Sequence, residues 1–200
     1  MYNQNLLKSL LEKINIKDQE KLEKIEIYIE NLKKWNKIMN LTSKHFDIIN
    51  HIQDSLMFFE VVENKSGNLI DIGSGNGFPA IILAILCNKL NITMVESNTK
   101  KSIFLKDTIH KLQIQANVLN IDILNIKTEK KFEYATIRGL KCNYKMQKII
   151  HSLLLNKQGK LIVWSYPPPL LKYFTLLNSI SKNNKYIHVY AKEQVEQQPI

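Results

Sequence analysis

The chain has 200 residues with 44% hydrophobic and 23% charged side chains, an ordinary composition for a soluble globular protein with one main domain. Lys and Arg number 28 against 18 for Asp and Glu, and the net charge of +10 favours nucleic acid over acidic small molecules as a partner. A disulfide framework and a metal site are not expected, because Cys87 and Cys142 are isolated, and the longest apolar run (80–87) is too short to span a bilayer.

The chain begins without a signal-peptide core, so we expect a cytoplasmic protein with no membrane partner, and we favour a monomer. Residues 6–14, 18–39 and 46–61 are predicted to be helices. In the second of them, apolar side chains recur at three- and four-residue steps from Leu22 to Trp35, and Asp18 can cap the helix. We expect residues 1–62 to form a helical cap on a second unit, residues 63–200, packed with it as one body.

From residue 68 the pattern alternates between apolar strands and helices. Strands are predicted at 68–72, 92–95, 118–121, 134–137, 160–164 and 186–190, and helices at 79–87, 100–112, 144–155 and 170–181. This order predicts an α/β fold with a doubly wound, mostly parallel, Rossmann-like sheet of about six strands. A complete methyltransferase sheet has about seven strands, so we expect the closing C-terminal strand to be absent or very short.

A glycine-rich turn follows the first strand. Asp71, Gly73, Gly75 and Gly77 form D-x-G-x-G-x-G, which resembles motif I of class I S-adenosylmethionine-dependent methyltransferases. Because glycine has no side chain, the backbone of such a turn can approach a ligand closely. Asp71 is expected near the ligand's amino-acid end. The third glycine comes one residue too early for the dinucleotide pattern G-x-G-x-x-G, so a dehydrogenase is the least favoured class.

Three further polar residues end strands on the predicted ligand side. Glu96 closes the second strand, where an acid receives ribose hydroxyls in such folds. Asp122 follows the third strand, where methyltransferases often hold the adenine. Arg138 ends the fourth strand and is the only arginine in the chain. Every other cationic Lys or Arg position of the chain is Lys. The planar guanidinium of Arg138 therefore predicts a positioning role, with a structural ion pair as the alternative.

Several segments occur in an order that resembles one bacterial family. These are N-L-K-K-W-N-K-I-M-N-L-T-S (31–43), H-I-Q-D-S-L (51–56), the glycine-rich turn, and V-E-S-N-T-K-K-S-I-F-L (95–105). Together they resemble the glucose-inhibited division protein B family, the small-subunit 16S rRNA guanine-N7 methyltransferases. The resemblance implies S-adenosylmethionine as cofactor and a guanine of 16S rRNA, in the small ribosomal subunit or its precursor, as acceptor. By matching positions it places the cofactor at Gly73, Gly75, Gly77, Phe78, Glu96, Ile123, Leu124 and Arg138.

The sequence also departs from the family pattern. Asn50 and Ala80 stand where the family has arginine and glycine, the R-A pair reads Arg138–Gly139, and residues 163–166 replace the L-K-G motif. Two alternatives therefore stay open: a degenerate, non-catalytic protein that binds RNA or ribosome precursors, and a methyltransferase that acts on small molecules.

The last group of candidates concerns RNA. Residues near Trp35 and at the start of the helix after Glu96 are candidates for RNA contact, namely Lys33, Lys34, Lys37, Asn40, Lys44, Lys100 and Lys101. No catalytic base is assigned, because guanine N7 carries a free lone pair and no proton, so the enzyme needs only to align the reacting atoms.

Overall fold

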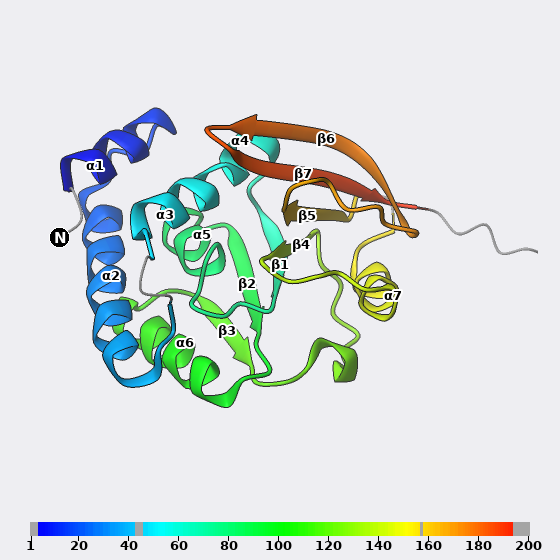
Figure 1. The fold of residues 1–200 in the computed structure, drawn as a ribbon, viewed down its shortest axis with the longest axis horizontal. Coiled ribbons are helices and arrows are strands. Elements are labelled where there is room, and N and C mark those ends of the chain that lie inside the picture. Colours follow the sequence, from blue (N-terminus) through cyan, green and yellow to red (C-terminus); the bar gives the residue numbers. More distant parts are fainter. Residues whose placement is uncertain (1–3, 43–45, 157, 194–200) are drawn as a thin grey trace, which may run out of the picture.

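A computed structural model describes residues 4–42, 46–156 and 158–193. Four N-terminal helices precede the sheet (Figure 1): α1 (Gln4–Lys13), α2 (Gln19–Met39), α3 (Ile48–Leu56) and α4 (Phe58–Val61). Asp18 caps α2 as predicted, because its side chain accepts hydrogen bonds from the backbone N–H groups of Glu20 and Lys21. The helix predicted for residues 46–61 is instead two helices that meet at Met57.

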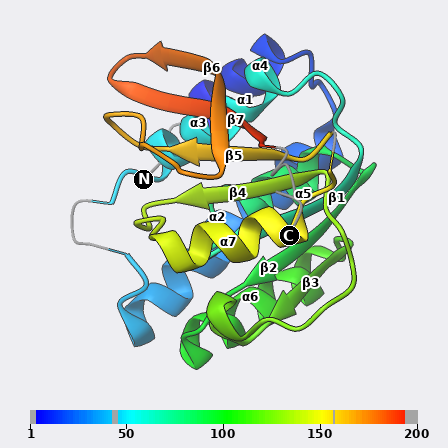
Figure 2. The same cartoon turned by 90° about the vertical axis from the view of Figure 1, so that its right-hand side faces the viewer.

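Seven strands form one sheet in the order β3-β2-β1-β4-β5-β7-β6 (Figures 1 and 2). They are β1 (Gly67–Ile72), β2 (Leu90–Val95), β3 (Ala116–Leu119), β4 (Tyr134–Arg138), β5 (Lys160–Trp164), β6 (Phe174–Lys182) and β7 (Lys185–Lys192). The pairs from β3 to β5 are all parallel, while β7 runs antiparallel to both of its neighbours. The order reverses between β1 and β4, so the carboxyl ends of these strands meet where such folds bind ligands.

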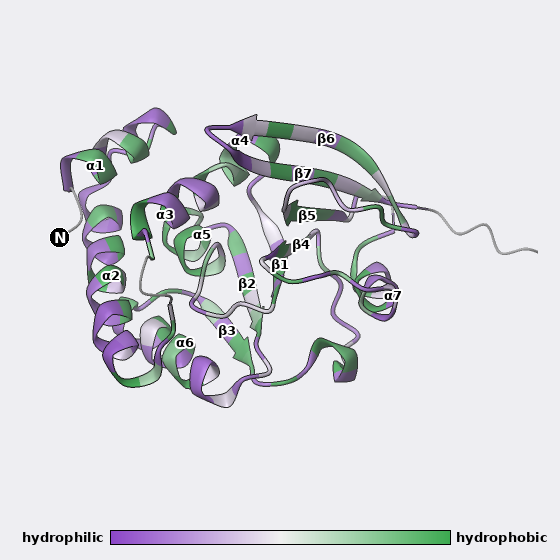
Figure 3. Ribbon diagram, in the orientation of Figure 1, coloured by the Kyte–Doolittle hydropathy of each residue, from purple (hydrophilic) through white to green (hydrophobic). Residues whose placement is uncertain are grey.

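Helices cover both faces of the sheet. Helices α5 (Ala80–Leu86) and α6 (Thr99–Leu112) pack on one face together with the N-terminal helices, and α7 (Tyr144–Leu153) lies on the other (Figure 2). Figure 3 shows α2 striped along its length with hydrophilic and hydrophobic residues, as expected for a helix that packs on one side. In the described part of the chain, no helix is long and apolar enough to cross a membrane.

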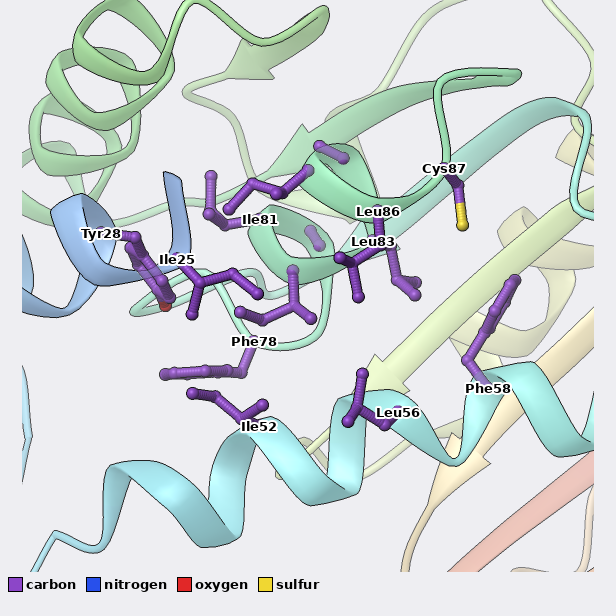
Figure 4. Close-up of a cluster of buried hydrophobic side chains, with 14 of the residues drawn as sticks. Ile25, Tyr28, Ile52, Leu56, Phe58, Phe78, Ile81, Leu83, Leu86 and Cys87 are labelled. Atoms are coloured by element: carbon purple, nitrogen blue, oxygen red, sulfur yellow. The ribbon is translucent and has the colours of Figure 1, made fainter. Parts of the chain in front are cut away.

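The N-terminal helices and the sheet with its covering helices share one apolar core (Figure 4). Ile25 of α2 and Ile52 of α3 point toward Phe78 and Ile81, which come from the turn after β1 and from α5. Ile25, Ile52 and Ile81 are fully buried, and Phe78 is 4% exposed. This packing fixes the glycine-rich turn against the N-terminal helices.

The C-terminal part differs most from the sequence prediction. Residues 170–181 were expected to be a helix, but Phe174–Lys182 is strand β6, and the closing antiparallel strand is present as β7. A two-residue turn, Asn183–Asn184, joins them, with φ of 50° and 60°. Asn tolerates this left-handed conformation, which a tight hairpin requires at both turn positions. Pairing with β7 therefore overrides the helix-compatible spacing of the leucines in this segment.

The third strand is also displaced, running from Ala116 to Leu119 rather than over 118–121. It pairs with β2 up to Val95↔Leu119. The next residue, Asn120, turns its side chain to donate hydrogen bonds to the carbonyls of Glu96 and Ser97, at 2.9 and 3.2 Å. These bonds tie the two strand ends together and end the strand earlier than the apolar run suggests.

Candidate functional site

A cleft of about 920 Å³ opens at the carboxyl ends of β1, β4 and β5. Its walls come from the glycine-rich turn, α3, the ends of β4 and β5, and the β6–β7 turn. A smaller hollow of about 320 Å³ extends from it toward β2 and β3, lined by Glu96, Ile121, Asp122 and Ile123 among others. Gly73, Gly75, Lys101, Arg138 and Gly139 line both spaces, so the two form one continuous site.

The glycine-rich turn presents backbone to this site. All three glycines have positive φ, and a Cβ on Gly77 would lie 2.6 Å from Ile81 Cγ1. At Gly75 the nearest atom to such a Cβ is the Gly73 carbonyl oxygen at 3.7 Å, so Gly75 faces open space. The loop is held from behind, because the buried Tyr28 hydroxyl donates to the Asn76 carbonyl at 2.6 Å. Only glycine satisfies both the conformation and the close approach.

Glu96 braces the same loop. One carboxylate oxygen accepts a hydrogen bond from the Gly75 N–H at 2.7 Å, and the other accepts from the Asn98 N–H at 2.8 Å. The side chain is 7% exposed and lines the small hollow. A carboxylate oxygen can accept more than one hydrogen bond, so Glu96 keeps acceptor capacity toward the hollow.

Asp71 lies beneath the loop and does not line either space. Its Oδ1 accepts from the Thr136 hydroxyl at 2.7 Å, and its Oδ2 is buried without a hydrogen-bond partner among the described residues. Burial raises the pKa of Asp71 to about 6 despite the hydrogen bond from Thr136. Because Asp71 lines neither space, it can favour a positively charged group above the turn only through its own charge.

The predicted adenine residues lie at the far side of the hollow. The Asp122 side chain accepts from the Leu124 N–H at 2.9 Å and so caps the short 3₁₀ helix Ile123–Asn125. Ile123 is 5% exposed and lines the hollow, together with Ile121 and Met146. Leu124 is 41% exposed and lies outside the lining. The structure therefore brings Asp122 and Ile123 to the hollow but turns Leu124 away.

Arg138 lies at the centre of a charged cluster in the wall of the larger cleft. Its Nη2 donates to Asp54 Oδ2 at 2.7 Å and contacts His51 Nδ1. Lys185 Nζ donates to the other oxygen of Asp54 and to the Asn50 carbonyl, both at 2.8 Å. Burial and the Arg138 guanidinium lower the pKa of His51 to about 4, so this ring is neutral near pH 7. The planar fork of Arg138 is thus held by an ion pair at the cleft wall.

With this geometry in place, the comparisons with known proteins decide the family. The family model described as "GidB: rRNA small subunit methyltransferase G" matches residues 21–165. The chain belongs to this family. The match ends at Ser165, just before the β5–β6 loop and the β6–β7 hairpin.

Two members of the GidB family show how far the likeness extends. The ribosomal RNA small subunit methyltransferase G of Dichelobacter nodosus is 36% identical over 116 residues, which is 56% of this chain and 53% of that protein. The protein of the same name from Rickettsia felis is 40% identical over 115 residues, or 56% of this chain and 57% of that protein. The chain therefore spans about half the length of the curated relatives that it matches.

Solved structures show the same fold at low identity. A mutant of MtNAS in complex with S-adenosylmethionine superposes with a TM-score of 0.64 at 14% identity, covering 84% of this chain and 72% of that chain. The ribosomal protein L11 methylase of Lactobacillus delbrueckii subsp. bulgaricus gives 0.57 at 15% identity, covering 74% and 81%. The sheet is thus a class I methyltransferase fold, as predicted, and the presence of the antiparallel strand β7 corrects the expectation that the closing strand is absent or very short.

The basic residues predicted to meet RNA are distributed unevenly in this GidB-family protein. Lys101 lines both spaces, and Lys100 is exposed beside it at the start of α6. The other candidates are exposed but do not line the cleft: Lys33, Lys34 and Lys37 of α2, and Asn40. Lys44 lies outside the described residues. Within the described ranges, no group of three or more His, Cys, Asp or Glu side chains could hold a metal ion.

Several cleft residues were missed from the sequence. The Trp164 indole donates to the Asp54 carbonyl at 2.8 Å, and residues 183–186 bring the β6–β7 turn to the cleft. Tyr166 and Tyr186 lie at its rim. The adjacent pair Asn183–Asn184 was the available signal, because it marks a tight hairpin between two strands.

Proposed function

We propose that this GidB-family protein binds S-adenosylmethionine and methylates N7 of a guanine in 16S rRNA, on the small ribosomal subunit or its precursor. The observation that carries the proposal is the open Gly75 beside the hollow of Glu96, within a chain of this family. The proposed cofactor residues are the predicted ones that line the two spaces: Gly73, Gly75, Phe78, Glu96, Asp122, Ile123 and Arg138. Asp71 and Gly77 support the turn without lining either space, and Leu124 is left out because it lies outside the lining.

The residues present fit this cofactor. The Gly75 side of the turn is open, so a ligand can approach the backbone. The hollow offers a carboxylate with spare acceptor capacity for ribose hydroxyls at Glu96 and apolar walls for a purine at Ile121 and Ile123. The unpartnered Oδ2 of Asp71 lies under the turn, where the amino end of the ligand would add a positive charge.

S-adenosylmethionine supplies a methyl group on a positively charged sulfur, so the protein needs only to align it with the acceptor lone pair. The glycine-rich turn and Glu96 would hold the cofactor, and the wall formed by His51, Asp54 and Arg138 limits where the acceptor base can enter. Arg138 has five N–H donors, and its bond to Asp54 leaves others free to position the acceptor or the cofactor. Neutral His51 adds no charge to this wall.

The degenerate alternative rests on lost basic residues, of which Asn50 is the clearest. In the structure Lys185 brings a positive charge to the same corner, with its Nζ 2.8 Å from the Asn50 carbonyl. Ala80 is fully buried in the core, so its extra methyl group is packed rather than projected into the cleft. Both observations favour an active enzyme over a degenerate one.

The deciding experiment maps 16S rRNA methylation by mass spectrometry of nuclease digests, in a strain that lacks the gene and in the same strain carrying it on a plasmid. We expect one guanine to lose its modification on deletion and to regain it on complementation. An unchanged pattern, together with measured binding of S-adenosylmethionine, would instead support the small-molecule alternative. Unchanged rRNA and no cofactor binding would support the degenerate one.

A further inference from the structure

The β5–β6 loop carries a tyrosine that projects into solvent at the rim of the cleft. Tyr166 follows β5 by two residues and is 74% exposed, although a buried position is usual for so large an aromatic ring. It lines the cleft together with Tyr186 of β7. The two ring centroids are 4.5 Å apart with an interplanar angle of 35°, so Tyr186 supports the Tyr166 ring from one side.

The loop that presents Tyr166 is anchored at both ends. The Ser165 carbonyl accepts from Nε2 of the buried His188 at 2.9 Å, and Nδ1 of the same ring is hydrogen-bonded to the Ser179 hydroxyl at 2.7 Å. A carbonyl can only accept, so Nε2 of His188 carries the proton of its hydrogen bond to Ser165. The Tyr190 hydroxyl donates to the Pro169 carbonyl at 2.9 Å, and three prolines (167–169) fix the backbone between these anchors. The exposed ring is therefore presented by a stiff segment.

The surroundings of this ring suit an RNA strand. Lys101, Arg138 and Lys185 line the same cleft. Among the described residues that line it, Asp54 is the one acidic side chain, and it is paired with Arg138 and Lys185. Asn183 and Asn184 add amide groups that can hydrogen-bond a base edge. In the sheet, Arg138 at the end of β4 pairs with Trp164 at the end of β5. Tyr166 follows Trp164 by two residues, so it lies just past the end of the strand next to the one that carries Arg138.

We propose that Tyr166, supported by Tyr186, is a stacking platform for a nucleobase of the single-stranded RNA segment that enters the cleft. Every base offers a π-face, and an exposed, preordered aromatic ring is the side chain that binds it. The proposal rests on the proposed function, because it takes RNA as the acceptor. It adds a binding residue beyond the segment that matches the family model, which ends at Ser165.

The test uses the full-length chain and a short single-stranded RNA that carries 2-aminopurine, whose fluorescence is quenched on stacking. Tyr166→Ala should lose the quenching and weaken RNA binding by roughly 5- to 100-fold, whereas Tyr166→Phe should keep both. Cofactor affinity measured by calorimetry should be the same in all variants. Tyr144→Ala is the matched control, because Tyr144 is another exposed tyrosine (45%) that lies outside the cleft lining.

The outcomes separate this proposal from the proposed function. Wild-type quenching and affinity in Tyr166→Ala, or no RNA binding by the wild type, would overturn the platform. A Phe variant as weak as the Ala variant would also overturn it, since the hydroxyl rather than the ring face would then bind. If the wild type quenches the probe but neither binds S-adenosylmethionine nor methylates small subunits, the proposed function fails while the platform stands.

Discussion

The two halves of the site are built in different ways. The cofactor half consists mainly of the backbone of the glycine-rich turn. Glu96 binds this turn across 21 residues and Tyr28 binds it across 48. The acceptor half consists of side chains from distant segments. Asp54 accepts from Lys185 across 131 residues, and its carbonyl accepts from Trp164 across 110.

This difference explains which half can vary. A backbone loop with positive φ at every glycine tolerates no side chain, so the glycines of the cofactor half are constrained one by one. The acceptor half depends on pairs of side chains, which can be replaced together, as when Lys185 supplies a cation beside Asn50. The family model matches residues 21–165, so it includes Asp54, Arg138 and Trp164 of the acceptor half and leaves out Lys185. Four variants would test this contrast, beginning with the largest expected effect.

Gly75→Val should break the cofactor half. A valine at φ +57° carries strain of about 1–2 kcal/mol, and its side chain would fill the space in which a ligand approaches the backbone. We expect S-adenosylmethionine affinity to fall at least ~100-fold, measured by calorimetry. Gly67→Ala is the control, because it strains the opposite end of β1 and should lower the melting temperature without changing affinity. Unchanged affinity in Gly75→Val would remove the loop from the cofactor site.

Arg138→Lys should break the acceptor half. Lysine keeps the charge but loses the planar fork, so we expect the methylation rate to fall by roughly one to two orders of magnitude. The partner Asp54 is 18% exposed and stays paired with Lys185, so stability should fall by only about 1 kcal/mol, measured by urea unfolding. A large loss of stability with full activity per folded molecule would show that Arg138 is only a structural ion-pair partner.

Asp71→Asn should sharpen the description of the cofactor half through pH. The folded protein holds the Asp71 proton up to a pKa of about 6, against 3.8 in the unfolded chain. The wild type therefore loses stability as pH rises through this window, and the variant lacks this loss. We expect the variant's stability relative to wild type to rise by about 2 kcal/mol between about pH 4 and pH 7. Urea unfolding of both proteins at the two pH values measures this difference. The same pH dependence of stability in wild type and variant would mean that burial does not raise the Asp71 pKa.

The smallest effect concerns the lysines at the mouth of the site. RNA affinity should fall steeply with salt, and replacing Lys101 with glutamine should reduce the slope of log K against log[salt] by about 0.7 for one lost phosphate contact. Lys89→Gln is the control, because Lys89 is exposed just before β2, at the amino ends of the parallel strands and away from the cleft at their carboxyl ends. A filter-binding series without salt dependence would favour a small-molecule acceptor.

The sequence alone determined the parts of the protein that depend on local signals. The Asp18 cap, the glycine-rich turn and the alternation of strands and helices through β5 all rest on neighbouring residues, and the structure confirms them. Glu96 lies beside the glycines in the wall of the small hollow, because its distance from them follows from one strand–helix–strand unit. Its role toward a cofactor stays a prediction.

Only the tertiary structure decided the rest. The leucines of residues 170–181 fit helical spacing, and pairing with β7 through the Asn183–Asn184 turn made the segment a strand instead. That hairpin completed the sheet and brought Lys185 and Tyr186 to the cleft. The partners of Arg138 were hidden for the same reason, since an ion pair across 84 residues leaves no periodic trace in the sequence. Contacts between distant segments arise only when the packed core sets their separation.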